Sequence, residues 1–301
     1  DIVLREMVLF PDSVQLHIAA LHTIVLLARP LGGREGMLFH SSMVLTGIFG
    51  GQHTAHPKSG IAVVVEAMQR FEDNDILQAM SCWALVNIAL APSQKAELVK
   101  LGGIKATCNA MLRHPFSAEV QFRALFALIN LVIPSVRLNR DNAEIAAGVE
   151  QIREVTDSSE REIIDEAVSE IASLVVQAMK NFCSSEAILN RACLVLHNLS
   201  LTHEYHSTLL WTPNCYQMLE WCLTNYRADQ VLQQSATGTL RRLQMTLSTD
   251  SALRVKFTEQ LQSQQQATLY QAHREALRLH QRQEELNRVE ADPEASYFFI
   301  E

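Results

Sequence analysis

Two pairs of histidines come closest to the residue types and spacing of a metal site. His53 and His56 stand three positions apart, and so do His203 and His206. Neutral imidazoles at this spacing can ligate zinc when further cysteines or histidines complete the shell. Neither pair has a cysteine nearby or a second pair placed with it. We interpret all four as ordinary surface histidines and expect no metal and no cofactor.

Sequence motifs for nucleotide, hydride and acyl chemistry are missing. The chain contains no G-x-x-x-x-G-K-[ST], G-x-G-x-x-G, G-x-S-x-G or H-E-x-x-H stretch, and each of these forms a known reactive loop or helix. Asn198-Leu199-Ser200 has the spacing of a glycosylation sequon, but it falls within an apolar repeat in a chain without a signal peptide pattern. We predict no catalytic residue, and hence that the chain is not an enzyme.

Cysteine usage and charge narrow the class of protein further. The cysteines are Cys82, Cys108, Cys183, Cys193, Cys215 and Cys222. They form no C-x-x-C pair, which is typical of reduced core cysteines. This predicts a cytoplasmic location, with the nucleus as an alternative; the cytoskeleton and the cilium are alternatives by analogy with other helical solenoids. The net charge of −8 argues against nucleic-acid binding. No apolar run reaches the ~18 residues of a membrane span, so no membrane insertion is expected.

A repeat of about 43 residues organises these side chains. Residues 66–89 and 109–132 align without a gap, and the same frame recurs three more times. One column holds Met7, Met68, Met111, Met179 and Leu223. A second holds Phe10, Phe71, His114, Phe182 and Tyr226. A third holds Ala20, Ser81, Ala124, Ala192 and Ala236, and a fourth Leu26, Asn87, Asn130, Asn198 and Arg242. Such a period with apolar steps of three and four indicates stacked helices.

The best-defined copies resemble an armadillo repeat. Gly102-Gly103 mark a break between a short first helix and a second helix, and the stretch SCWALVNIA (81–89) matches the end of the family's third helix. HEAT repeats are the near alternative. The resemblance covers about residues 1–260 and implies an all-α fold, an armadillo-type right-handed superhelical solenoid of about five repeats with a long C-terminal helix. We expect no β-sheet.

The repeat frame predicts a solenoid over 1–249 and a C-terminal part over 250–301. The repeats, called copies one to five, are expected at about 1–28, 61–89, 98–132, 168–200 and 207–247, with insertions at about 29–60 and 134–166. Copy one begins inside its second helix and the chain lacks an initial Met, which we interpret as a processed or truncated start.

The two insertions and the C-terminal part differ in composition. The first insertion holds seven of the 11 glycines, which flank a short helix predicted near 37–49. In the second, residues 150–166 are strongly acidic and form either a solvated decoration or a segment that binds a partner or the chain itself. Residues 251–291 predict an amphipathic helix that caps the last repeat or reaches another subunit. The apolar tail Tyr297, Phe298, Phe299 and Ile300 is a second expected contact.

The resemblance also implies a binding groove. In the armadillo family, third helices line a concave face whose Asn side chains hold the backbone of an extended peptide, since an amide both donates and accepts. The matching residues are Asn87, Asn130 and Asn198, with Trp83, Phe126 and Leu194 four positions before them. The alternative is that these Asn residues pack between neighbouring repeats.

Arginines give the expected groove its charge. Arg123 and Arg191 lie seven residues before Asn130 and Asn198, on the same helical face. Together with Arg242 they predict an acidic partner segment, which residues 150–166 could mimic by occupying the groove. The alternative is that the arginines pair with glutamates of adjacent helices.

The sequence thus predicts a non-enzymatic scaffold that is one subunit of a larger assembly and binds an extended or helical protein segment in its concave groove. By analogy with other armadillo solenoids, that assembly is cytoskeletal or ciliary. A transport adaptor of the importin-alpha type and a regulatory domain of a larger enzyme are the alternatives. The stacking frame also makes a core prediction. Leu85, Leu128 and Leu196, two residues before each Asn, should be almost fully buried.

Overall fold

The computed structural model describes residues 2–27, 59–133, 136–138, 154–156, 158–266, 274–275 and 277–278. Contacts divide the chain into two units, Asp1–Gln244 and Met245–Glu301, and each is considered separately. The described part of the first unit is an α-helical solenoid, as the repeat predicts.

Copy three shows how the sequence sets the three helices of a complete repeat. Helix α5 (Pro92–Lys100) is followed by α6 (Gly103–Arg113) and α7 (Ala118–Leu131). Gly102, between the first two helices, has φ of 87°, a left-handed conformation that favours glycine. A Cβ on Gly103 would lie 2.6 Å from the Cδ1 atom of Leu98. The Gly-Gly pair therefore forms the predicted break.

The other repeats contain two or three described helices. Copy one has α1 (Ile2–Leu9) and α2 (Val14–Leu27), and copy two has α3 (Gly60–Arg70) and α4 (Asp75–Ile88). Copy four has α9 (Ser158–Asn181) and α10 (Glu186–Leu199). Copy five follows the 3-10 turn η1 (His203–Tyr205) with α11 (His206–Trp211), α12 (Cys215–Asn225) and α13 (Gln230–Thr249), the last of which crosses the boundary between the units.

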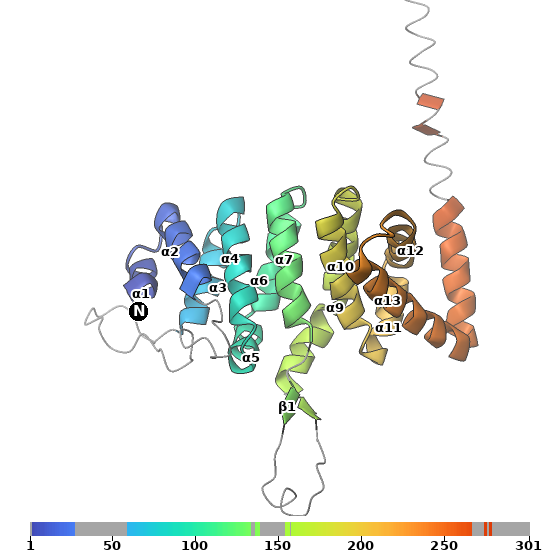
Figure 1. Ribbon diagram of the computed structural model, residues 1–301, viewed down its shortest axis with the longest axis horizontal. Helices are drawn as coiled ribbons and strands as arrows, with labels where there is room; N and C mark the ends of the chain where they lie inside the picture. Colours follow the sequence, from blue (N-terminus) through green and yellow to red (C-terminus); the bar gives the residue numbers. More distant parts are fainter. Residues whose placement is uncertain are drawn as a thin grey trace, which may run out of the picture. The chain divides into compact units, whose positions relative to one another are not determined.

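Within the first unit the helices form layers. The third helices α2, α4, α7 and α10 contact one another in chain order and lie side by side (Figure 1). The second helices α1, α3, α6, α9 and α12 do the same in a second layer. The side chains between the layers form the core, where Leu85, Leu128 and Leu196 are fully buried, as predicted.

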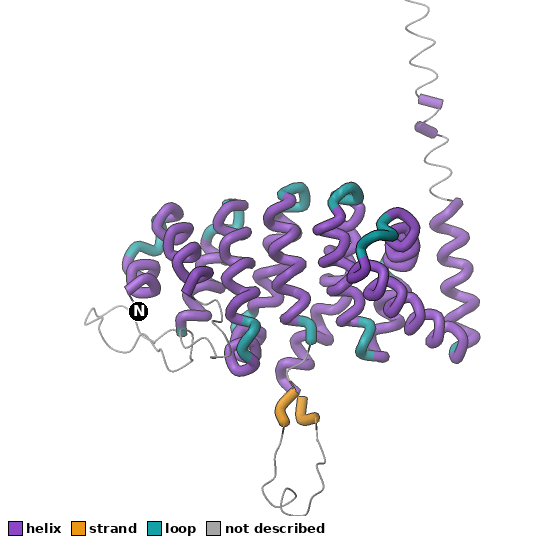
Figure 2. Tube along the Cα trace, in the orientation of Figure 1, coloured by secondary structure: helices purple, strands orange, loops and turns teal. Residues whose placement is uncertain are grey.

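The all-α expectation holds in the described residues apart from one two-stranded β-hairpin. Strands β1 (Val136–Leu138) and β2 (Glu154–Thr156) pair antiparallel within the second insertion, with Val136 opposite Thr156 (Figure 2). Helix α9 begins at Ser158, so residues 158–166 form its first turns. An antiparallel pair lets the chain leave the solenoid and return to the same place, as an insertion between repeats requires.

In the second unit, residues 251–266 are helical and Phe257 is buried. Most of the predicted helix beyond residue 266, and the apolar tail at 297–300, lie outside the described residues, as does the first insertion from 28 to 58. None of the described helices combines the length and apolar character needed to cross a bilayer.

Candidate functional site

The predicted site residues lie on the third helices, on a surface we call the third-helix face. It consists of Trp83 and Asn87 on α4, Arg123, Phe126 and Asn130 on α7, Arg191, Leu194 and Asn198 on α10, and Arg242 on α13. Each of these side chains is half-buried. Because α4, α7 and α10 contact one another in order, the structure brings the predicted residues of copies two to four together on neighbouring helices.

The three Asn side chains of this face connect neighbouring repeats. The Nδ2 group of Asn87 donates to the carbonyl of Val25 at 2.9 Å. Asn130 donates in the same way to Val86 at 3.4 Å, and Asn198 to Ile129 at 2.9 Å. The acceptor in each case belongs to the third helix of the preceding copy.

The alternative in which Asn packs between repeats therefore accounts for the bonds that the structure contains. An amide group has more capacity than one donated bond uses. The Oδ1 atoms of the three Asn residues have no protein partner within the described part of the chain.

Arg123 is held by its own helix and by the preceding repeat. Its guanidinium pairs with Glu119, one turn earlier on α7, and its Cζ atom lies 3.8 Å from the centroid of the Trp83 ring. A cation over an indole face is attracted by the ring quadrupole. Of the two alternatives for this arginine, the structure shows pairing with a glutamate, which comes from the same helix and not from an adjacent one.

Arg191 also stacks on aromatic rings of the preceding repeat, but unlike Arg123 it has no ion pair with a carboxylate of its own helix. Its Cζ atom lies 4.9 Å from the ring centroid of Phe126 and 5.2 Å from that of Phe122. Its Nη1 donates to the Asn190 amide oxygen at 2.9 Å, and Asn190 donates in turn to Asp229 at 2.6 Å. No carboxylate in the described residues pairs directly with Arg191, and its Nε atom is buried without a hydrogen-bond acceptor.

Arg242 lies in a different environment. Its Nη1 is 3.4 Å from Nδ1 of His197 and 3.3 Å from the Ser200 hydroxyl. Burial, and then the charge of Arg242, lower the pKa of His197. Copy five has Gly238 where the earlier copies have Trp83, Phe126 and Leu194, and the His197 ring fills the space, since a Cβ there would be 3.1 Å away. The pattern in which an arginine stacks on an aromatic ring of the preceding repeat therefore ends at copy four.

The described acidic residues of 158–166 do not lie among these arginines. Glu160 is fully buried and pairs with Lys95 of α5 at 3.4 Å. Asp165 accepts a hydrogen bond from the Tyr205 hydroxyl, and Arg161 pairs with Glu204 at 3.3 Å. Glu160 and Asp165 therefore contact α5 and η1 and not the third-helix face. Residues 150–153 of the acidic segment lie outside the described residues.

A column of glutamines was missed in the sequence. Gln78 donates from Nε2 to the carbonyls of Met68 and Phe71, at 2.8 and 2.9 Å. Gln121 and Gln233 make the same pair of bonds in copies three and five. Each glutamine donates to two of the last carbonyls of its own second helix, which lack a partner within that helix. The carbonyls of Phe71 and His114 also accept from the backbone N–H groups of Asn74 and Ser117. The signal was present, since these residues stand three positions before the small column.

The histidines and cysteines do not form a reactive site in the described chain. His206 is buried and donates from Nε2 to the Ser200 carbonyl at 2.8 Å, while His53 and His56 lie outside the described residues. The six cysteines are free thiols, five of them buried. Burial raises the pKa of Cys82 and of Cys215 to about 12. Across the described residues, no group of three or more His, Cys, Asp or Glu could hold a metal ion.

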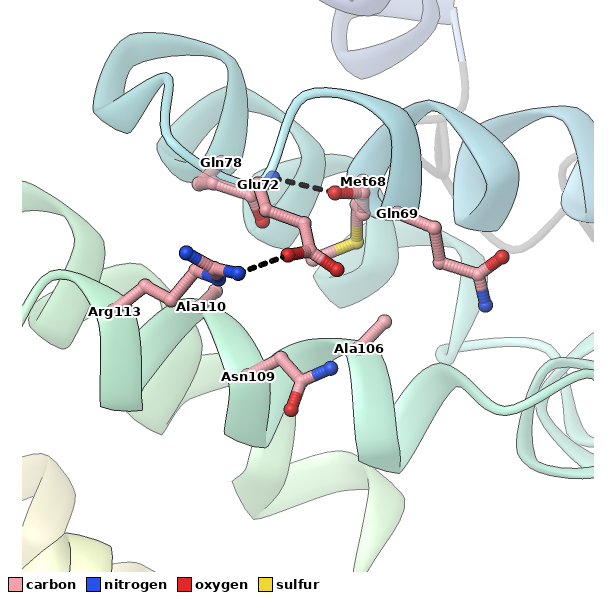
Figure 3. A pocket seen from close by; sticks show the side chains of 8 residues that line it. All are labelled: Met68, Gln69, Glu72, Gln78, Ala106, Asn109, Ala110 and Arg113. Atoms are coloured by element: carbon pink, nitrogen blue, oxygen red, sulfur yellow. Dashed lines mark hydrogen bonds and ion pairs between the residues drawn. The ribbon is translucent and has the colours of Figure 1, made fainter.

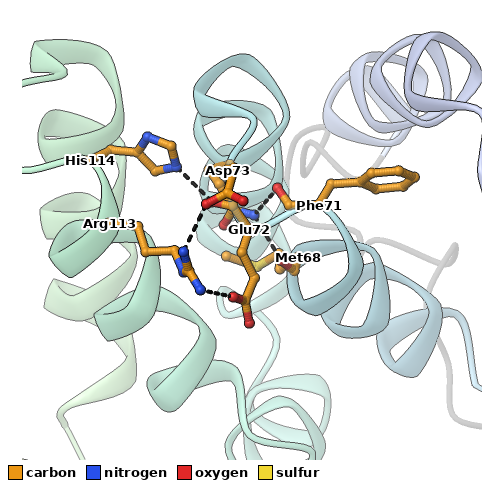
Figure 4. Close-up of polar contacts among 7 residues, drawn as sticks. Met68, Phe71, Glu72, Asp73, Arg113 and His114 are labelled. Atoms are coloured by element: carbon orange, nitrogen blue, oxygen red, sulfur yellow. Dashed lines mark hydrogen bonds and ion pairs between the residues drawn. The ribbon is translucent and has the colours of Figure 1, made fainter.

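A small pocket lies between α3 and α6, with a cavity volume of about 10 Å³ (Figure 3). Ligand sites for small molecules usually span about 300–1,000 Å³. Arg113 reaches Glu72 and Asp73 beside this pocket, and His114 donates to the Glu72 carbonyl at 2.7 Å, while Phe71 points the opposite way (Figure 4). We interpret the pocket as part of the junction between copies two and three.

The sequence profile of the LRRK2 ARM repeat family matches residues 60–295, more than half of the chain. No curated protein sequence shows significant similarity to it. The match agrees with the helical repeat, the glycine break and the side-chain ladder between third helices described above. The chain therefore belongs to the LRRK2 ARM repeat family.

Proposed function

We propose that this protein is a non-enzymatic protein-interaction scaffold whose third-helix face binds an extended, acidic segment of a partner. Armadillo solenoids serve as protein-interaction scaffolds, which supports the first part of the proposal. The binding surface and the charge of the partner rest on side chains of this chain alone.

The observation that carries the proposal is the alternation of arginine and aromatic rings across α4, α7 and α10. Trp83 is followed by Arg123, and the pair Phe122 and Phe126 is followed by Arg191. The rings fix the guanidinium planes, and a pre-positioned guanidinium loses less entropy when it binds a carboxylate. Arg191 has no carboxylate of its own in the described chain, so a partner's carboxylate is its natural counter-ion.

The three Asn side chains of the third-helix face complement the positive charge of its arginines. The free Oδ1 atoms of Asn87, Asn130 and Asn198 can accept from backbone N–H groups of an extended strand whatever its side chains are. The same amides donate to the preceding repeat, which holds each oxygen in a fixed position. An extended acidic peptide offers N–H donors for the three Asn oxygens and a carboxylate for Arg191.

The proposal is tested with a fluorescent twelve-residue peptide of alternating Glu and Ala, titrated over a series of salt concentrations. We expect Arg123→Glu combined with Arg191→Glu to weaken binding at least about tenfold and to flatten the salt dependence. The matched control is Lys105→Glu combined with Lys180→Glu, which makes the same charge change at exposed positions on second helices. Equal affinity of the arginine variant and wild type, with helicity retained, would show that this face is not the binding site.

A further inference from the structure

Each of the three Asn residues of the third-helix face is followed, three positions later, by a large apolar residue. We call these three residues the apolar row: Leu90, Ile133 and Leu201. They are 51%, 40% and 55% exposed, respectively. A single exposed leucine is ordinary on a protein surface. Exposure at the same position of three successive repeats is a property of the repeat, and it marks a surface that a partner contacts.

The apolar row has one local geometry in all three repeats. The N–H group of Leu90 donates to the Asn87 carbonyl at 3.3 Å, and that of Leu201 to the Asn198 carbonyl at 3.2 Å. The residue directly before each member is the C-cap of its third helix and has right-handed helical backbone angles: Ala89, Val132 and Ser200. Each apolar side chain therefore follows the last turn of its helix in the same way.

The hydrogen bonds of the Asn side chains hold neighbouring third helices in register. Asn130 donates to the carbonyl of Val86, the residue directly before Asn87. Asn198 donates to the carbonyl of Ile129, the residue directly before Asn130. Equivalent positions of α4, α7 and α10 therefore lie side by side across the array (Figure 1). The apolar row consequently runs across the three helices, parallel to the row of Asn residues.

The arginines and the apolar row lie on opposite sides of the Asn residues. Arg123 and Arg191 precede their Asn by seven positions, which is about 10 Å toward the helix N-terminus, and the apolar row lies about 5 Å toward the C-terminus. Both positions fall within about 80° of one another around the helix axis, so they share a face. The carbonyl end of a helix carries partial negative charge, which disfavours a carboxylate beside the apolar row.

We propose that the segment bound by the third-helix face has acidic and apolar residues in alternation, with its apolar side chains on the apolar row. This inference rests on the proposed function and specifies the sequence of the partner. In an extended strand the N–H groups lie at right angles to the side chains, and successive side chains point in opposite directions. A strand whose N–H groups face the Asn oxygens thus directs one set of side chains to the arginines and the other set to the apolar row.

Fluorescent twelve-residue peptides test this inference. Alternating Glu-Val is compared with alternating Glu-Ala, and with a peptide that has the same glutamates and valines in two blocks. We expect alternating Glu-Val to bind the wild type at least about tenfold more tightly than either of the others, since valine buries more apolar area than alanine. The block peptide cannot direct all its acids to one side and all its valines to the other.

Substitutions in the apolar row locate the effect. Leu90→Ser combined with Leu201→Ser should remove the advantage of Glu-Val and leave the affinity for Glu-Ala unchanged. Leu112→Ser is the control, because Leu112 is 60% exposed on the second helix α6 and should keep the advantage. All of these positions are exposed, and circular dichroism checks that each variant folds.

The other outcomes separate this inference from the proposed function. Equal affinity for Glu-Val and Glu-Ala, with Glu-Ala binding still dependent on the arginines, would overturn the inference and leave the proposed function standing. Equal affinity for the block peptide would show that alternation is wrong, and failure of every peptide to bind would refute both proposals. A dimer that becomes a monomer in analytical ultracentrifugation when Leu90 and Leu201 are replaced would make a second copy of the chain the occupant and contradict the inference.

Discussion

Asn and Gln side chains join helices and repeats of this protein through hydrogen bonds to backbone carbonyls. Asn130 and Gln121 both lie on α7, but Asn130 bonds the preceding repeat and Gln121 bonds the end of its own second helix. The repeat frame predicted where the Asn residues lie and that they share a face with the arginines. It could not predict their partners, because an amide suits a bound peptide and a neighbouring carbonyl equally well.

The glutamine column leads to a prediction at the same scale. Gln121→Met keeps the volume but leaves the Met111 carbonyl without its side-chain donor. It also removes one of the two bonds to the His114 carbonyl, which still accepts from the Ser117 N–H group. We expect a loss of about 1–3 kcal/mol in the free energy of unfolding, the usual cost of stranding buried acceptors. Urea denaturation measures it, with the exposed Gln69→Met as control, which should change stability by less than about 0.5 kcal/mol. An equally small change for Gln121→Met would mean that water replaces the donor.

At the scale of elements, the helices of the repeat follow from the sequence and the insertion does not. The Gly102-Gly103 break and the apolar columns marked the helices of copies two and three, because an amphipathic helix has a clear period. The strands β1 and β2 are three residues each, too short to show an alternation. The first turns of α9 were assigned to the insertion because they are acidic, although a solvated helix start favours acidic residues.

The core prediction belongs to this scale. Leu128 of α7 is fully buried in the layer where α4, α7 and α10 contact one another. Leu128→Ala should lower the free energy of unfolding by about 2–5 kcal/mol, from lost burial and the cavity left behind. Thermal and urea unfolding followed by circular dichroism check this, with the exposed Leu112→Ala as control. A loss below about 1 kcal/mol would imply that α7 has a different rotation about its axis.

Across the molecule, the first unit is a linear array in which helices contact neighbouring repeats, as expected for a solenoid. A buried ion pair joins copies three and four of this array. The Nζ atom of Lys95 on α5 lies 3.4 Å from Glu160 of α9 and also donates to the Ile133 carbonyl. Lys95 thereby contacts the chain at both ends of the second insertion, at Ile133 before it and at Glu160 near its end. Composition could not predict it, since lysine and glutamate usually indicate surface.

Breaking this pair should destabilise the array. Lys95→Met removes the cation 3.4 Å from the Glu160 carboxylate, which has no solvent exposure, and we expect a loss of about 3–5 kcal/mol. Lys95→Met combined with Glu160→Gln also removes the buried negative charge and should recover part of that loss. Comparison of the unfolding midpoints of the two variants is the measurement. A double variant no more stable than the single one would show that the charge is not the cause.

The direction of three hydrogen bonds between third helices has a consequence for how the protein forms in the cell. Asn87, Asn130 and Asn198 each donate to a carbonyl of the repeat that precedes them in the chain. A ribosome makes the acceptor before the donor, so every emerging repeat finds a finished template to which it can bond. We therefore expect the solenoid to assemble during translation, one repeat at a time from the N-terminal side, without waiting for the chain to be complete.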